Sequence, residues 1–86
     1  MYRVEFTSQA EDDLVNIDRT IAQRITVKID WLSQNMEHII AEPLSGKFKG
    51  KYKLRVGDWR IVYLYNSPEQ VITIYAIEHR SKVYKD

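Results

Sequence analysis

The sequence contains no cysteine, three glycines, two prolines and no long apolar run. The lack of cysteine excludes disulfides, cysteine zinc sites and cysteine nucleophiles, and it fits a reducing compartment. No stretch approaches the ~20 apolar residues that cross a bilayer, and the N-terminus lacks the apolar segment of a signal peptide. We therefore expect a cytoplasmic protein that has no membrane partner.

Motifs for metal and nucleotide chemistry are also missing. The two histidines, His38 and His79, lie far apart, and neither belongs to a His-x-x-x-His or Glu-x-x-His pattern. The chain has no glycine-rich phosphate loop and no Gly-x-Ser-x-Gly elbow. We expect no metal and no cofactor, and the commonest covalent-hydrolase routes are excluded.

The length of 86 residues predicts a single domain, residues 1–86, with one modest core. Residues 2–6 alternate apolar and charged side chains, which is typical of a half-buried strand. Ser8 and Glu11 fit a capping box that begins a helix. One face of this helix carries Ala10, Leu14 and Ile17.

A second apolar stripe follows at spacings of three and four residues, made of Ile21, Ile25, Ile29, Leu32 and Met36. The two stripes fit one bent helix or, preferably, a helical hairpin that breaks near residues 18–20. Strand patterns follow from Tyr52 onward, separated by turns at residues 56–59 and 66–69. The order β-α-α-β-β-β predicts an α+β fold, with the helical hairpin packed on one face of a largely antiparallel four-stranded sheet.

Charge is distributed unevenly along the chain, although the net charge is only +1. Residues 1–42 carry four basic and eight acidic residues, a net charge of −4. Residues 43–86 carry nine basic and four acidic residues, a net charge of +5. Such asymmetry is typical of proteins that present one face to a polyanion.

The basic half contains a stretch in which every second residue is cationic. It comprises Lys47, Lys49, Lys51, Lys53 and Arg55. In a strand, this period places all five side chains on one face, where they suit a phosphate backbone. A solvated edge strand, whose lysines prevent aggregation, fits the same pattern.

Two arginines and a tyrosine complete a candidate site for phosphoryl chemistry. Arg60 lies on the strand after the turn, and Arg80 and Tyr84 follow the last strand. Arginine can bind two phosphate oxygens at once. Arg60 also suits a structural ion pair with Asp58 or Glu78, and Tyr84 suits a C-terminal anchor. The aromatic residues Trp59, Tyr52 and Tyr63 fit base stacking, but at these spacings they are more often core residues.

The segments YKLRVGDWRIVYLY and IEHRSKVY resemble the RelE/ParE toxin superfamily, and most closely its RelE-like branch. The shared elements are a basic strand ending in Leu-Arg, a turn with glycine, an aromatic-Arg-x-x-Tyr strand and a terminal His-Arg-x-x-x-Tyr. Together with the order of elements, the resemblance covers essentially the whole chain. It implies a toxin of a type II toxin–antitoxin system, held inactive by a cognate antitoxin in a hetero-oligomeric complex.

RelE-like toxins are metal-free endoribonucleases that cleave mRNA, typically in the ribosomal A site. The resemblance implies that the RNA 2′-hydroxyl attacks the adjacent phosphate and that Arg60 and Arg80 stabilise the transition state. Lys51 or Lys53 is implied as a general base, Tyr84 as the residue that orients the nucleophile or stacks on a base, and His79 as a further acid–base candidate. The expected RNA-binding residues are Lys47, Lys49, Arg55 and Lys82.

Two other functions fit the same fold. ParE-like members lack the nuclease residues and inhibit DNA gyrase, and a non-toxic RNA-binding relative fits as well. Retention of Arg60, Arg80 and Tyr84 favours the nuclease. The two rivals predict, respectively, DNA damage with intact messages and RNA binding without cleavage.

Overall fold

Strands β3 (Tyr52–Val56), β4 (Trp59–Asn66) and β5 (Val71–His79) form an antiparallel meander at the centre of the sheet. The computed structural model describes residues 1–83. Strand β1 (Arg3–Phe6) lies parallel to β5, and the short β2 (Glu42–Pro43) pairs antiparallel with β3, so the sheet order is β1-β5-β4-β3-β2. The expected α+β fold is confirmed, with five strands instead of four. A two-residue edge strand that contains proline carries no strand pattern, so the sequence did not predict it.

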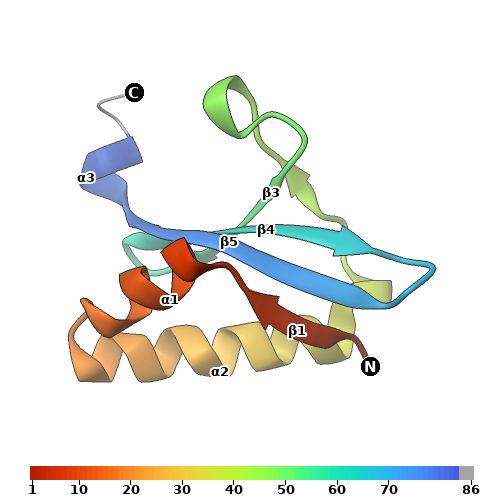
Figure 1. The fold of residues 1–86 in the computed structure, drawn as a ribbon, viewed down its shortest axis with the longest axis horizontal. Helices are drawn as coiled ribbons and strands as arrows, with labels where there is room; N and C mark the ends of the chain where they lie inside the picture. The colour runs from red at the N-terminus through yellow and green to blue at the C-terminus, as the bar shows by residue number, and fades with distance from the viewer. Residues whose placement is uncertain (84–86) are drawn as a thin grey trace.

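Helices α1 (Ser8–Val15) and α2 (Arg19–Asn35) form the expected helical hairpin and cover one face of the sheet (Figure 1). On the opposite side, the described chain places the short 3₁₀ turn η2 (Gly46–Phe48) and the terminal helix α3 (Arg80–Val83). A second 3₁₀ turn, η1 (Met36–His38), follows α2. We call the face of the sheet opposite the hairpin the open face.

Short polar side chains set both helix starts. The Asp18 carboxylate accepts hydrogen bonds from the backbone N–H groups of Thr20 and Ile21, so the hairpin breaks where the sequence predicted. The prediction that Ser8 caps α1 is wrong, because the cap is Thr7, whose Oγ1 accepts from the Ala10 N–H at 3.1 Å. Strand β1 ends at Phe6, as the pattern indicated, Thr7 keeps extended geometry, and Ser8 is already the first helical residue.

The core lies between the helical hairpin and the sheet. Ile25, Ile29 and Leu32 of α2 are buried against inward-facing residues of β4 and β5, among them Ile61 and Ile74. Burial of an aliphatic side chain of this size stabilises the fold by about 2 kcal/mol. Both apolar stripes predicted from the sequence are therefore confirmed as the helical side of one core.

A β-bulge on β5 shapes the open face. Val62 pairs with Ala76 and Tyr63 pairs with Ile74, so Tyr75 is the extra residue. Helix α1 satisfies the disturbed backbone, because Thr7 Oγ1 donates to the Tyr75 carbonyl at 2.7 Å and Asp13 Oδ2 accepts from the Ile77 N–H at 2.9 Å. The bulge brings Tyr75 onto the same face as Ala76.

Candidate nucleic-acid interface

Among residues 1–83, the most buried ion pair of the open face joins Arg60 and Glu78. They are register partners on β4 and β5, and Arg60 Nε and Nη2 both donate to Glu78 Oε1, at 3.3 and 3.0 Å. Each side chain is only 17% exposed. The Arg60 guanidinium also lies 5.3 Å from the centre of the Phe48 ring. Asp58 and Glu78 were the two predicted ion-pair partners of Arg60, and Arg60 pairs with Glu78.

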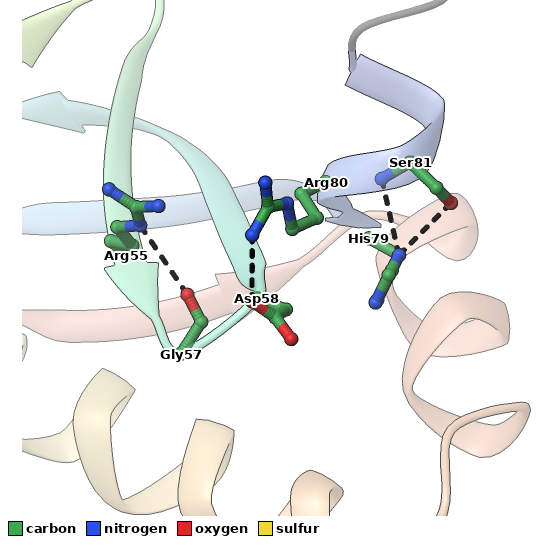
Figure 2. A network of polar contacts seen from close by, with 6 residues as sticks. All are labelled: Arg55, Gly57, Asp58, His79, Arg80 and Ser81. Carbon is green, nitrogen blue, oxygen red and sulfur yellow. Dashed lines mark hydrogen bonds and ion pairs between the residues drawn. The ribbon is translucent and has the colours of Figure 1, made fainter.

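Arg80 is held at the end of the β3–β4 turn by Asp58 (Figure 2). Its backbone N–H donates to the Asp58 carbonyl at 2.8 Å, and its Nη1 lies 3.4 Å from Asp58 Oδ1. The two side chains are 53% and 63% exposed. An ion pair this exposed contributes no more than about 1 kcal/mol.

The two lysines expected to be catalytic make different contacts. Lys53, on β3, has its Nζ 3.9 Å from Glu42 of the neighbouring edge strand. Lys51 precedes β3, and its Nζ lies 4.4 Å from the centre of the Tyr75 ring. The cation–π contact is made possible by the β-bulge that brings Tyr75 to this face.

A shallow pocket of about 220 Å³ collects most of these side chains. It is lined by Lys53, Arg55, Arg60 and Arg80 together with Glu42, Asp58 and Trp59. Its volume is below that of pockets that hold drug-sized ligands. Four cations around so small a space suit a single phosphodiester group.

The prediction that five alternating cations lie on one strand is wrong. Only Lys53 and Arg55 lie on β3, whereas residues 46–50 form η2 and a turn. Gly46 and Gly50 have φ of +67° and +91°, a left-handed conformation that breaks the extended chain. The turn packs the Phe48 ring against Val62 and Ala76. The free energy gained by burying this ring exceeds what continued strand pairing would contribute.

The expected RNA-binding residues therefore do not form one row, and they differ in whether they reach the pocket. Arg55 lines it, and its Nε donates to the Gly57 carbonyl at 3.4 Å. Lys47 lies with its Nζ 5.2 Å from the centre of the Phe48 ring, and Lys49 is exposed. Lys82 is exposed on α3. Of these four residues, the structure brings only Arg55 to the pocket wall.

His79 faces away from the pocket. It is the register partner of Trp59, and their rings meet edge to face at 5.0 Å. Its Nδ1 accepts the Ser81 N–H at 3.2 Å (Figure 2), so the neutral ring carries its proton on Nε2. Alternation along β5 puts His79 and Glu78 on opposite faces. Tyr84, the remaining candidate, lies outside the described residues.

The other aromatic candidates belong mainly to the core. Tyr63 is 1% exposed, and its burial raises the pKa of its phenol to about 12. Tyr52 packs on both Tyr63 and Tyr65, with ring centres 5.9 and 5.1 Å apart. Burial likewise raises the pKa of Tyr65. Tyr63 and Trp59 pack in or against the helical-side core, in keeping with the structural interpretation of these residues.

Sequence reasoning did not place Glu42 or Tyr75 in the site. Glu42 reaches it through the unpredicted edge strand β2, and Tyr75 reaches it through a bulge that no sequence pattern marks. Within residues 1–83, no group of His, Asp and Glu side chains is arranged to hold a metal ion. None of the helices in that range is both long and apolar enough to cross a membrane.

A helical hairpin on one side of an antiparallel sheet, with cations around a pocket on the other side, is the architecture of a RelE-like toxin domain. Residues 4–84 match the family of the ParE toxin of type II toxin–antitoxin systems (parDE). The chain therefore belongs to this family, and it is a toxin of a type II toxin–antitoxin system within the RelE/ParE superfamily.

Individual relatives agree with this assignment. Toxin RelE of Mycobacterium tuberculosis is 29% identical over 84 residues, which cover 98% of this chain and 87% of the relative. A chain of the RelBE2 toxin–antitoxin complex from the same organism is 26% identical, with a TM-score of 0.75 over 92% of this chain and 98% of that chain. The isolated E. coli RelE toxin shares the fold, with a TM-score of 0.76 at 21% identity over 99% of this chain and 93% of that chain.

Proposed function

We propose that this toxin is an endoribonuclease that cleaves messenger RNA in the ribosomal A site. The observation that carries the proposal is the convergence of Arg60, Arg80 and Lys53 on one small pocket of the open face. The three residues come from β4, from the start of α3 and from β3, so the fold brings cations from separate segments together.

The proposed reaction is a transfer within the RNA. The 2′-hydroxyl oxygen attacks the adjacent phosphorus, and the bond to the 5′-oxygen breaks, which leaves a cyclic phosphate and a free 5′-hydroxyl. Negative charge grows on the phosphorane oxygens in this step. Arg60 and Arg80 would stabilise that charge, and such preorganised electrostatic stabilisation is usually the largest contribution to catalysis. Lys51 and Lys53 would bind flanking phosphates and supply protons.

The ribosome would present the message to this face. The open face is shallow and basic, and its phosphate contacts carry little base selectivity of their own. We therefore expect a purified toxin to cut free RNA slowly and a message in the A site quickly. Rapid cutting of free RNA by the purified protein would contradict ribosome dependence without affecting the fold.

A cognate antitoxin is the second proposed partner, and a groove between α2 and β3 suits it. Val27 and Trp31 are 69% and 39% exposed there, and they line about 690 Å³ of open volume. Arg24, Lys28 and Arg55 surround this apolar strip. Solved complexes of RelB with RelE from E. coli and Pyrococcus horikoshii share the toxin fold. An acidic amphipathic segment of the antitoxin would match the groove in both charge and shape.

Induction in cells tests the nuclease proposal. Wild type and Arg80→Ala are expressed with Arg3→Ala as a matched control, because Arg3 is an exposed arginine on the far edge strand. We expect growth arrest and new 5′ ends within translated codons for wild type and Arg3→Ala, and loss of both for Arg80→Ala. Thermal melting of Arg80→Ala and Arg3→Ala checks that both variants are folded.

Gyrase inhibition is the second candidate function, and the match of residues 4–84 to the ParE toxin family favours it. It predicts growth arrest with DNA damage and intact messages, unchanged by Arg80→Ala. A third outcome, RNA binding without cleavage or arrest, would identify a non-toxic relative.

A further inference from the structure

Glu78, the ion-pair partner of the pocket residue Arg60, is less exposed than the two carboxylates that line the pocket. Its side chain is 17% exposed, whereas Glu42 and Asp58, the partners of Lys53 and Arg80, are 71% and 63% exposed. Glu78 Oε1 receives both hydrogen bonds from Arg60. Within residues 1–83, its second oxygen, Oε2, accepts no hydrogen bond from the protein.

An ion pair with so little exposure contributes little net free energy to the pairing of β4 with β5. Removing two charges from water costs several kcal/mol, and well-packed apolar residues of similar volume are often at least as stable. Apolar side chains flank this position, because Val62 and Ala76 occupy the neighbouring site on the same face. A carboxylate at this position, with one oxygen free of protein hydrogen bonds, can accept a proton from a ligand bound to Arg60.

The geometry of Arg60 leaves room for a phosphate to bind beside Glu78. A guanidinium has five N–H donors in a planar fork. Nε–H and one Nη2–H point to Glu78, which leaves three N–H groups for a ligand. A phosphodiester held by those donors would share the guanidinium with the carboxylate, which would place its flanking 2′-hydroxyl on the side of Oε2.

We propose that Glu78 is the general base of this toxin: its Oε2 takes the proton from the attacking 2′-hydroxyl while Arg60 binds the phosphate. The inference rests on the proposed ribonuclease function and deepens it. The 2′-oxygen forms a bond to phosphorus, the bond from phosphorus to the 5′-oxygen breaks, and the leaving oxygen takes a proton from the Lys53 ammonium or from water. Glu78 returns its proton to solvent after the products leave.

The other candidate bases fit less well. An ammonium has three donors and no lone pair, so Lys51 and Lys53 can accept a proton only after losing one. His79 lies on the opposite face against Trp59. A glutamate that touches the phosphate-binding arginine needs no prior proton loss and no rearrangement of the sheet.

Single-turnover cleavage of a message in the ribosomal A site tests the proposal. Glu78→Gln keeps an oxygen for Arg60 but removes the proton acceptor, and the exposed Glu69→Gln serves as the matched control. We expect Glu78→Gln to lower the rate by roughly 10²–10⁴-fold at saturating toxin, with apparent affinity near that of wild type. Glu69→Gln should match wild type. A loss below tenfold for Glu78→Gln would overturn the assignment.

Two further measurements separate a general base from a residue that only positions Arg60. First, a message with a 5′-bridging phosphorothiolate needs no acid for its leaving group, so the Glu78→Gln defect should persist on it, whereas full rescue would make Glu78 part of leaving-group protonation. Second, formate should restore cleavage by Glu78→Ala in proportion to its concentration, and formamide should not. Equal rescue by both would reduce Glu78 to a hydrogen-bond partner.

The same assays separate failure of the inference from failure of the function. If wild type cuts the message and Glu78→Gln cuts it equally well, only the inference is wrong. If wild type leaves the message intact, the proposed ribonuclease function fails and the inference fails with it. Thermal melting of each variant confirms that the compared proteins are folded.

Discussion

Arg80 and Asp58 are joined twice, by a hydrogen bond from the Arg80 N–H to the Asp58 carbonyl at 2.8 Å and by a side-chain contact of 3.4 Å. The first contact ties the start of α3 to the β3–β4 turn, and the second joins the Arg80 guanidinium, which lines the pocket, to the Asp58 carboxylate (Figure 2). The backbone contact positions Arg80 whether or not the side chains remain paired. In the proposed function, a phosphate would replace the Asp58 carboxylate without moving the chain.

Removal of the Asp58 charge should therefore strengthen RNA binding. Asp58→Asn keeps the backbone contact and raises the charge of the pocket by one. Because the exposed pair contributes no more than about 1 kcal/mol, we expect up to roughly fivefold tighter binding of an RNA oligonucleotide at low salt. Asp12→Asn, an exposed change of equal charge on α1, should have a smaller effect. Equal effects of both variants would show that only net charge matters.

Thr7, and not Ser8, should be important for stability. Thr7→Val removes the N-cap of α1 and the hydrogen bond to the Tyr75 carbonyl that supports the bulge. We expect a loss of about 1–2 kcal/mol in the free energy of unfolding, measured by denaturant titration. Ser8→Ala should stay within about 0.5 kcal/mol of wild type. A larger loss for Ser8→Ala than for Thr7→Val would contradict the observed cap.

Stability should fall in alkaline solution because of Tyr63. Burial raises its pKa to about 12 in the folded state, so the unfolded chain loses the phenolic proton first as pH rises above 10. The contribution of the Tyr63 phenol to the free energy of unfolding is complete below pH 10. It is lost as pH rises through about 12, a change of roughly 2–3 kcal/mol. Tyr63→Phe should flatten this part of the profile in chemical denaturation. An unchanged slope would mean that other groups cause it.

The groove between α2 and β3 should bind the antitoxin and not the RNA. Trp31→Ala removes an exposed anchor whose ring lies 4.1 Å from Lys28 Nζ. Because buried tryptophans are frequent hot spots, we expect at least tenfold weaker affinity for the antitoxin that suppresses toxicity on co-expression, with unchanged message cleavage. Val15→Ala on α1, also exposed, is the control. Loss of cleavage in Trp31→Ala would place the groove in the RNA site.

High salt offers an independent check on the same groove. Arg24, Lys28 and Arg55 surround its apolar strip, so an acidic partner should dissociate more readily as salt screens the exposed charges. Equal antitoxin affinity at low and high salt would contradict an acidic docking segment. The apolar contacts of Val27 and Trp31 should persist under both conditions.

The helical hairpin was accessible to prediction because helix signals are local. Apolar residues at spacings of three and four define the buried face of α2, and Asp18 marks its start within the same few residues. The β3–β4 turn was predictable for a similar reason, since Gly57 at φ +57° occupies a two-residue loop. The position of the cap was missed by one residue, because the contact of Thr7 with β5 is long-range.

The basic row shows where a periodic pattern fails. Alternation from Lys47 to Arg55 predicts a strand, but Phe48 is buried on the open face and two glycines adopt left-handed geometry. The gain from covering Val62 and Ala76 decides the conformation of this segment. That gain depends on residues that are distant in sequence, so the local pattern could not reveal it.

By itself, the sequence determined the order of elements, the helical core face, the accumulation of positive charge in the second half and the arginines around which a site can form. These features follow from local periodicity and composition. Only the tertiary structure decided that Arg60 is bound to Glu78, that His79 faces the other side, and that Tyr75 joins the open face. Strand register and a single-residue bulge select those contacts, and both depend on packing between segments that are far apart in the chain.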